Sequence, residues 1–397
     1  MKNDVNRQKS REYGYKNKYR KKIVYICSIL FLIIFIGMLY LKIFNRNYNS
    51  YETLTTISNL GNTVSNILNY RNSIIKYNQD GVTAIDENGK LLWNGVYEMN
   101  DPIADNCGQY VAVADRGKRV VYIYDEKGET AKVATLHNII KIEISMQGIV
   151  AVLMEEDDGN YINLYYPNGA LLTNDEKENV LVEIYTNAQK DGIPIDMAYS
   201  DNGIKLITSY LSFNSSQIMN KVSFYNFNEV GQNNIDRFVG GYIYENRIVP
   251  KVTFLNNDTA CLFADNGFIV FNIHEVSKML YQKTFESKIQ SIFYNKKYIG
   301  IVLKEDGKTE KQLLLYNLKG NKIIDCSLEF EYDQIFISGD EIIMYDNLSC
   351  LIMKTNGKIK FKYTFANGIE ALYPINNRDT YFLITNSEIS KIRLLDN

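Results

Sequence analysis

The sequence is poor in the residues that most catalytic sites use. Its 397 residues include only two histidines, five cysteines and one tryptophan. It has no Cys-x-x-Cys motif, which argues against a zinc knuckle or a thioredoxin-type redox pair. Phosphate-cradling glycine motifs and the Gly-x-Ser-x-Gly turn of many hydrolases do not occur either. We therefore expect no catalytic residues, no metal and no cofactor.

The chain also has only five prolines, while 46% of its residues are hydrophobic. This composition excludes a disordered chain. Asn, Ile, Lys and Tyr are used heavily, with 31 tyrosines in all. Such an excess of β-branched and aromatic residues favours strands over helices.

Charge is distributed unevenly along the chain. Residues 1–22 contain nine Lys/Arg and two acidic residues, a net charge of 9 − 2 = +7, although the whole chain has a formal net charge of −2. The remainder therefore has a net charge of −2 − 7 = −9. A basic tail followed by an acidic body indicates that the two parts lie on opposite sides of a boundary.

An uncharged apolar run, Ile23–Leu41, separates the tail from the body. A run of about 20 apolar residues is long enough to span a bilayer as a helix. A cleaved signal peptide is the alternative, but its apolar region is usually about 7–15 residues long and a small-residue cleavage site follows it. We therefore predict a transmembrane signal-anchor helix over residues 23–44. The basic tail at 1–22 is expected in the cytoplasm, and residues 45–397 are expected outside the cell membrane.

Hairpin turns repeat along the rest of the chain. Val82–Trp93 contains two apolar segments around Asn88-Gly89, a strong hairpin signal. In similar turns, Gly128 follows Gly89 by 39 residues and Gly169 follows Gly128 by 41 residues, and Gly357 follows Gly320 by 37 residues. Repeats of about 40 residues with four strands each are typical of a β-propeller. We predict an all-β, eight-bladed β-propeller, with seven blades as the alternative, an insertion near 174–192, and a closing strand near Tyr51–Ile57.

One repeat resembles a known family. Ala84-Ile-Asp, Gly89-Lys90 and Trp93 match the pattern of the quinoprotein-type (PQQ-like) propellers. The resemblance implies an eight-bladed ring and covers about a dozen residues of the first repeat. The quinone-dependent dehydrogenases of that family have adjacent paired cysteines, whereas no two cysteines are adjacent here. The anchored layout is more similar to the non-enzymatic envelope scaffolds of the family, and to uncharacterised single-span propeller proteins of low-GC bacteria.

The segments that join one blade to the next offer candidate binding residues. Such segments gather at one end of a propeller's channel, and Tyr and Arg are common anchors of binding surfaces. The candidate interaction face consists of Tyr97, Asp101, His137, Tyr242, Tyr244, Arg247, Tyr332 and Asp333. The acidic run Glu155–Asn160 lacks the alternating ligand spacing of a calcium loop and is expected to be a solvated turn.

These features predict a non-catalytic, membrane-anchored binding or scaffold module of the cell envelope. We expect a protein or cell-wall partner and no nucleic acid. The alternative is an anchored enzyme that acts on glycans or oxidises a small substrate in the mouth of the ring. Cys107, Cys261, Cys326 and Cys350 are compatible either with disulfides or with free buried thiols.

Overall fold

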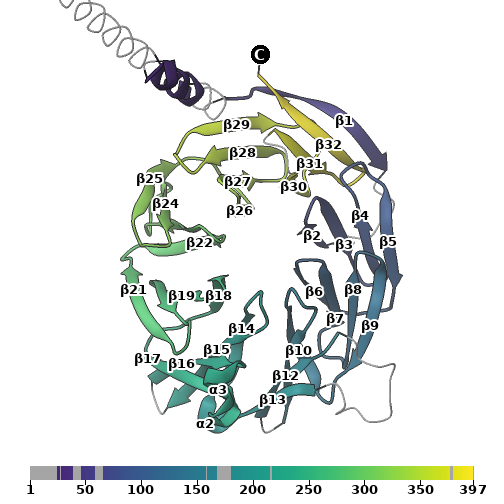
Figure 1. The fold of residues 1–397 in the computed structure, drawn as a ribbon, viewed down its shortest axis with the longest axis vertical. Coiled ribbons are helices and arrows are strands. Elements are labelled where there is room, and N and C mark those ends of the chain that lie inside the picture. The colour runs from purple at the N-terminus through teal and green to yellow at the C-terminus, as the bar shows by residue number, and fades with distance from the viewer. Residues whose placement is uncertain are drawn as a thin grey trace, which may run out of the picture.

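The computed structural model describes residues 25, 26, 28–38, 46–58, 66–157, 159–167, 180–214, 217–375 and 379–396. Within these ranges the chain forms eight four-stranded sheets that follow one another around a ring (Figure 1). The predicted all-β, eight-bladed propeller is confirmed, and the seven-bladed alternative is wrong.

Each blade is an antiparallel meander of strands in chain order. Blade 1 consists of β2 (Asn66–Tyr70), β3 (Ser73–Tyr77), β4 (Gly81–Ile85) and β5 (Leu91–Val96), and blade 2 consists of β6 (Pro102–Cys107), β7 (Tyr110–Asp115), β8 (Val120–Asp125) and β9 (Gly128–Ala134). Blade 3 consists of β10 (Asn138–Ile144), β11 (Val150–Glu156), β12 (Gly159–Tyr165) and β13 (Val180–Asn187), and blade 4 consists of β14 (Ile193–Tyr199), β15 (Lys205–Asn214), β16 (Gln217–Asn226) and β17 (Phe238–Glu245). Blade 5 consists of β18 (Lys251–Asn256), β19 (Thr259–Ala264), β20 (Gly267–Asn272) and β21 (Lys278–Thr284), and blade 6 consists of β22 (Lys288–Tyr294), β23 (Tyr298–Lys304), β24 (Lys311–Asn317) and β25 (Lys322–Leu328). Blade 7 consists of β26 (Gln334–Ser338), β27 (Glu341–Tyr345), β28 (Ser349–Lys354) and β29 (Ile359–Thr364). Blade 8 consists of β30 (Ala371–Pro374), β31 (Thr380–Ile384) and β32 (Glu388–Leu395), together with β1 (Ser50–Ser58).

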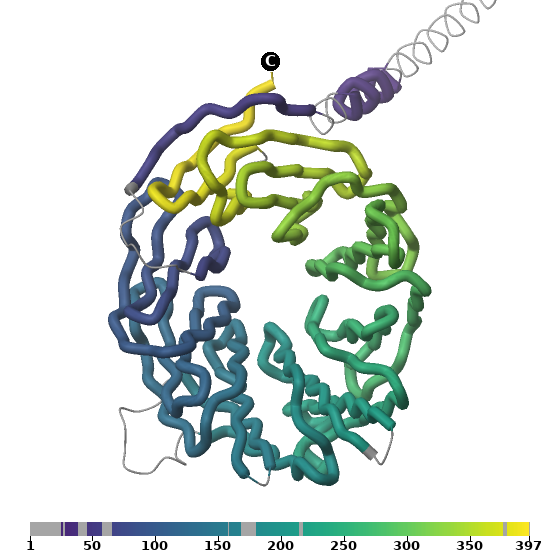
Figure 2. Tube along the Cα trace, turned by 180° about the vertical axis from the view of Figure 1, so that it is seen from behind, coloured from purple at the N-terminus to yellow at the C-terminus, as the bar shows by residue number. Residues whose placement is uncertain are grey.

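The eighth blade joins the two ends of the chain. β1 pairs antiparallel with β32, from Ser50 opposite Leu395 to Ser58 opposite Glu388. The strand expected near Tyr51–Ile57 is therefore the fourth strand of this blade. Figure 2 shows the purple N-terminal strand beside the yellow C-terminal segment. This pairing covers the edge that β32 would otherwise expose.

The meander gives the ring two distinct faces. We call one of them the N-terminal face. It carries the turns that join the first strand of a blade to the second, and the third strand to the fourth. The segment before β1 lies there, because the Lys354 ammonium donates to the Arg46 carbonyl at 2.9 Å beside the β28–β29 turn. The far face carries the turns from second to third strands and the segments that join successive blades.

The hydrophobic core is divided among the blade interfaces. One cluster joins Val121 and Ile123 of blade 2 to Ile142 and Val152 of blade 3, and comparable clusters lie between other neighbouring blades. Trp93 of blade 1 stacks on Tyr124 of blade 2, with ring centroids 5.0 Å apart and planes 3° from parallel. Packing between neighbours therefore stabilises the ring in place of one central core.

The structure refines one predicted segment and adds two short helices. Within the insertion expected near 174–192, residues 180–187 are β13 and Ala188–Asp191 form the short helix α2, while residues 174–179 lie outside the described range. Val180, Val182 and Ile184 alternate with exposed or partly exposed residues, a strand pattern that the neighbouring charged residues masked in the sequence. Blade 4 also contains two short helices, α3 (Glu229–Gln232) and η1 (Ile235–Arg237).

The described N-terminal helical residues are 25, 26 and 28–38, and they lie outside the ring (Figure 1). Among the described residues, no helix combines the length and apolar character needed to cross a bilayer. The basic tail at 1–22, and the remaining parts of the predicted 23–44 helix, fall outside the described residues.

Candidate interaction face

The first predicted pair, Tyr97 and Asp101, lies on the far face between β5 and β6. Tyr97 is only 7% exposed, and its hydroxyl donates to the Gly81 carbonyl at 2.9 Å. Burial raises the pKa of Tyr97. Asp101 is exposed, and its carboxylate is 3.5 Å from Nε of Arg116. Tyr97 is therefore a packing residue, whereas Asp101 faces solvent.

His137 belongs to a row of aromatic rings on blade 3. Its ring stacks on Tyr161, with centroids 4.3 Å apart, and Tyr161 in turn contacts Tyr185 at 5.1 Å. Nδ1 of His137 is 3.5 Å from a Glu156 carboxylate oxygen. Tyr185 is 45% exposed. Sequence reasoning missed the two tyrosines because their cross-strand pairing in β12 and β13 is visible only in the structure.

Tyr242 and Tyr244 were expected in a loop, but they lie in the outer strand β17. Tyr242 packs against Phe271 of blade 5, with centroids 4.8 Å apart, and donates to the Ser277 carbonyl at 3.3 Å. Burial raises the pKa of Tyr244 to about 12, with the nearby Arg247 acting in the opposite direction. The loop placement is wrong because β16 continues to pair with β17 as far as Glu245.

Arg247 does follow β17, in the segment that leads into blade 5. Its guanidinium carbon is 5.8 Å from the centre of the Tyr244 ring, a cation–π contact. Nε and Nη2 are inaccessible to solvent and have no hydrogen-bond partner among the described residues. Arg247 is therefore only partly exposed, and its guanidinium packs against the outer strand of blade 4.

The last pair, Tyr332 and Asp333, lies between β25 and β26. The Tyr332 hydroxyl donates to Oγ of Ser291 at 2.9 Å, and the Lys311 ammonium lies 5.0 Å from the centre of its ring. Asp333 is exposed. The tyrosines of the predicted interaction face thus pack between blades, whereas the neighbouring carboxylates of Asp101 and Asp333 are exposed to solvent.

Acidic side chains dominate the connections of the far face. Its described connections contain fifteen acidic residues and six basic ones. The acidic residues are Asp80, Glu98, Asp101, Asp157, Asp191, Asp265, Glu286, Glu305, Asp306, Glu310, Glu329, Glu331, Asp333, Asp346 and Glu370, and the basic ones are Arg116, Lys118, Arg119, Lys190, Arg247 and Lys308. A surface of this charge attracts cationic groups and repels anionic ones.

Charged residues also line the central channel on blades 3–5. The Lys141 ammonium is 2.5 Å from Oδ1 of Asp196 and 3.0 Å from Glu143. Oδ2 of Asp196 accepts the Val252 amide at 2.8 Å and lies 3.4 Å from the Lys251 ammonium. Burial disfavours the charge of Lys141, but the carboxylates of Glu143 and Asp196 outweigh it and raise its pKa. These contacts hold the innermost strands of three blades together.

Asp105 is the corresponding carboxyl of blade 2. It accepts the Ile144 amide of blade 3 at 2.8 Å. Burial, together with the negative charge of Glu143, raises the pKa of Asp105 to about 8. None of these channel residues was predicted. The alternation of Lys141 and Glu143 with apolar neighbours is a signal that these two residues share one face of a strand, but it does not place Asp196 of blade 4 beside them.

A cavity of about 330 Å³ opens beside these residues, between blades 2, 3 and 4. Its apolar lining includes Ile103, Ile140 and Leu153, and its polar lining is Arg116, Lys141 and Asp196. Its single lining carboxylate, Asp196, is already paired with two lysines. The lining residues that the structure describes therefore offer no free pair of carboxyl groups of the kind that glycoside hydrolysis uses.

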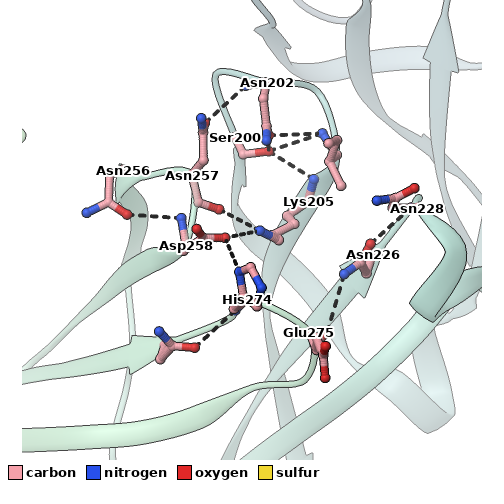
Figure 3. A network of polar contacts seen from close by, with 12 residues as sticks. Ser200, Asn202, Lys205, Asn226, Asn228, Asn256, Asn257, Asp258, His274 and Glu275 are labelled. Carbon is pink, nitrogen blue, oxygen red and sulfur yellow. Dashed lines mark hydrogen bonds and ion pairs between the residues drawn. The ribbon is translucent and has the colours of Figure 1, made fainter.

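Contacts between turns join the blades on the N-terminal face (Figure 3). Lys205 of blade 4 forms an ion pair with Asp258 of blade 5 and donates to the Asn257 carbonyl at 2.9 Å, and His274 is 3.4 Å from Asp258. The hydrogen bond from Lys205 lowers the pKa of Asp258.

Another contact joins two blades that are not neighbours in the ring. The Lys296 ammonium of blade 6 lies 2.5 Å from Oδ2 of Asp201 of blade 4. No cluster of three or more His, Cys, Asp or Glu side chains suited to a metal occurs in the described part of the chain. The four cysteines of the propeller are free thiols.

Comparison with known proteins gives a family and a fold. The sequence model of DUF5711, a family of unknown function, matches residues 44–394. No curated protein matches the sequence. The resemblance to the quinoprotein-type repeat stays a prediction.

Among solved structures, the chain is similar to BamB from Moraxella catarrhalis, with 11% identity, a TM-score of 0.54, and coverage of 87% of this chain and 100% of that one. Hydrazine synthase from Kuenenia stuttgartiensis has 13% identity, a TM-score of 0.45, and coverage of 74% and 93%. BBS1N, solved in complex with ARL6DN, has 11% identity, a TM-score of 0.46, and coverage of 88% and 98%. At this identity, the similarity to BamB is evidence for the propeller fold alone.

Proposed function

We propose that this chain, which belongs to the DUF5711 family of unknown function, is a non-catalytic binding module tethered to the cell membrane. In this proposal the N-terminal helix anchors the ring, and the far face binds a protein or cell-wall partner outside the cytoplasm. The tether raises the effective concentration of the module at the membrane.

The observation that carries the anchoring is the exposure of the N-terminal helix. Its described aliphatic and aromatic side chains are at least half exposed, from Phe35 at 51% to Tyr25 at 72%. They point in every direction around the helix, since they occupy the consecutive positions from Ile29 to Ile36. A helix that is apolar all round is stable only when something apolar surrounds it, and a bilayer fits the charge step between tail and body.

Two features support binding over catalysis. The far face combines exposed carboxylates with the aromatic row of His137, Tyr161 and Tyr185, which suits the recognition of a cationic partner. The channel cavity contains no carboxylate free to act as acid or base, because Asp196 is already paired with Lys141 and Lys251.

Anchoring and orientation are tested first. Membranes that contain the full chain are washed at alkaline pH and then treated with protease from outside intact cells or vesicles. We expect the chain to remain in the membrane and the propeller to be digested from the extracytoplasmic side. Release by the alkaline wash would contradict the anchor.

Binding is tested by crosslinking and pull-down from the same membranes. The variant Glu329→Lys/Asp333→Lys reverses two exposed charges on the far face, and Glu229→Lys/Glu275→Lys makes the same change on the N-terminal face. We expect only the far-face variant to lose partners. Equal retention by both variants would contradict the assignment of this face.

A further inference from the structure

The N-terminal face has aliphatic side chains around its rim, and β-bulges account for several of them. The outer strand of blade 1 shifts register between Leu91 and Trp93, and that of blade 5 shifts between Met279 and Tyr281. A bulge leaves its extra residue unpaired. As a result consecutive aliphatic residues are exposed near the start of the strand: Leu91 at 53%, Leu92 at 44%, Met279 at 49% and Leu280 at 50%.

Turns on the same face add further exposed apolar side chains. These are Met146 on blade 3, Ile235 on blade 4 and Val276 on blade 5, and Ile359 lies at the start of β29 on blade 7. Ile235 is 88% exposed. Because they are spread over several blades, these side chains are placed to meet a flat surface and not a narrow groove. On the far face, the large exposed apolar side chains of the described residues are fewer: Val96 on blade 1, Val120 on blade 2, Tyr185 on blade 3, Ile193 and Phe213 on blade 4, and Leu348 on blade 7.

The length of chain between helix and ring brings this face near the membrane. The apolar run ends at Leu41, and Arg46 already contacts blade 7. Five residues, at about 3.5 Å each, extend no further than about 18 Å. The rim beside Arg46 therefore lies close enough to touch the headgroup region once the helix spans the bilayer.

Charge favours the same orientation. The connections of the N-terminal face contain nine basic and eleven acidic residues within the described ranges, and so are nearly balanced. Anionic lipids repel the acidic far face, whereas lysines among aliphatic residues, such as Lys90 beside Leu91, suit a lipid interface.

We infer that the N-terminal face lies flat on the lipid bilayer that holds the anchor helix, with the aliphatic rim in the headgroup region. This inference rests on the proposed membrane anchoring. It leaves the acidic far face and the channel cavity directed away from the membrane, toward partners.

The test places single tryptophans on the two faces. In a Trp93→Phe background of the full chain, Ile235→Trp reports on the N-terminal face and Phe213→Trp, at a residue 72% exposed, on the far face. Each variant is reconstituted in phosphatidylcholine–phosphatidylglycerol vesicles that contain a headgroup nitroxide lipid. We expect Ile235→Trp fluorescence to be quenched at least threefold more than Phe213→Trp fluorescence. Equal quenching of the two would overturn the inference.

A second measurement uses the unmodified chain, so it does not depend on the folding of a variant. Lysine acetylation is compared between the same vesicles, without the nitroxide lipid, and detergent micelles. We expect Lys90, Lys319 and Lys358 on the N-terminal face to be protected in vesicles, and Lys118 and Lys308 on the far face to react equally in both. Uniform reactivity would overturn flat docking. If the chain still resists the alkaline wash in that case, the anchor stands without the docking.

Discussion

A buried ion pair within blade 7, in contact with a tyrosine of blade 8, allows a quantitative test of the fold. Lys360 is only 3% exposed and forms an ion pair with Glu341, whose other carboxylate oxygen accepts the Tyr381 hydroxyl at 2.5 Å. The Lys360 ammonium also lies 2.7 Å from the Tyr381 oxygen. Lys360→Met keeps the aliphatic bulk of the side chain but removes the charge that compensates Glu341.

The size of the effect follows from the carboxylate that remains. Removing one partner of a buried ion pair costs about 3–5 kcal/mol. The cost cannot exceed the free energy needed to protonate the unpaired carboxylate, because the protonated form carries no charge. That free energy is about 1.4 kcal/mol for each pH unit above the ordinary glutamate pKa of about 4.3. We therefore expect Lys360→Met to lower the free energy of unfolding by about 3–4 kcal/mol at pH 8, and by about 1–1.5 kcal/mol at pH 5.5.

Urea denaturation of the full chain in detergent, followed by the fluorescence of Trp93, measures this difference. Lys322→Met is the matched control, because its ion pair with Asp325 lies at the surface, and we expect no measurable change in its urea midpoint. The double variant Lys360→Met/Glu341→Gln should recover most of the lost stability. The reasoning is refuted if Lys360→Met matches the control, or if its cost is the same at both pH values.

Three further predictions concern the ring as a whole. Deleting residues 46–58 removes β1 and exposes the edge of β32, so we expect concentration-dependent aggregation in analytical ultracentrifugation, whereas deletion of residues 1–22 leaves the ring monodisperse. Trp93→Ala should lower the free energy of unfolding by about 3–5 kcal/mol, because it removes a buried ring that stacks on Tyr124. Thermal melting followed by circular dichroism measures this loss, and the control Tyr166→Ala, at an exposed residue, should have little effect. Because the folded-state pKa of Asp105 is raised from 3.8 to about 8, the folded protein binds more protons than the unfolded chain between these values, and stability falls as pH rises through that window. Asp105→Asn should flatten this fall in urea midpoints measured from pH 5 to 9, and an unchanged slope would contradict the assignment.

The number of blades and the closure of the ring were predictable from sequence. Turn glycines such as Gly89 and Gly128 repeat at one-blade spacing because the turn between the third and fourth strands of blades 1, 2, 6 and 7 contains a glycine with positive φ. The strand near Tyr51–Ile57 was identified because the eighth repeat lacks a fourth strand. These features are local and periodic, so they are visible without knowledge of the fold.

The direction of individual side chains was decided only by tertiary structure. A bulge between Ile139 and Lys141 shifts the alternation of β10, and the pairing of Lys141 with Asp196 depends on a neighbouring blade 55 residues away. Tyr242 and Tyr244 were predicted in a loop, but the extended pairing of β16 places them in β17. Alternation along one strand specifies which residues share a side, but bulges and the packing of the next blade determine which side faces the channel, the neighbouring blade or solvent.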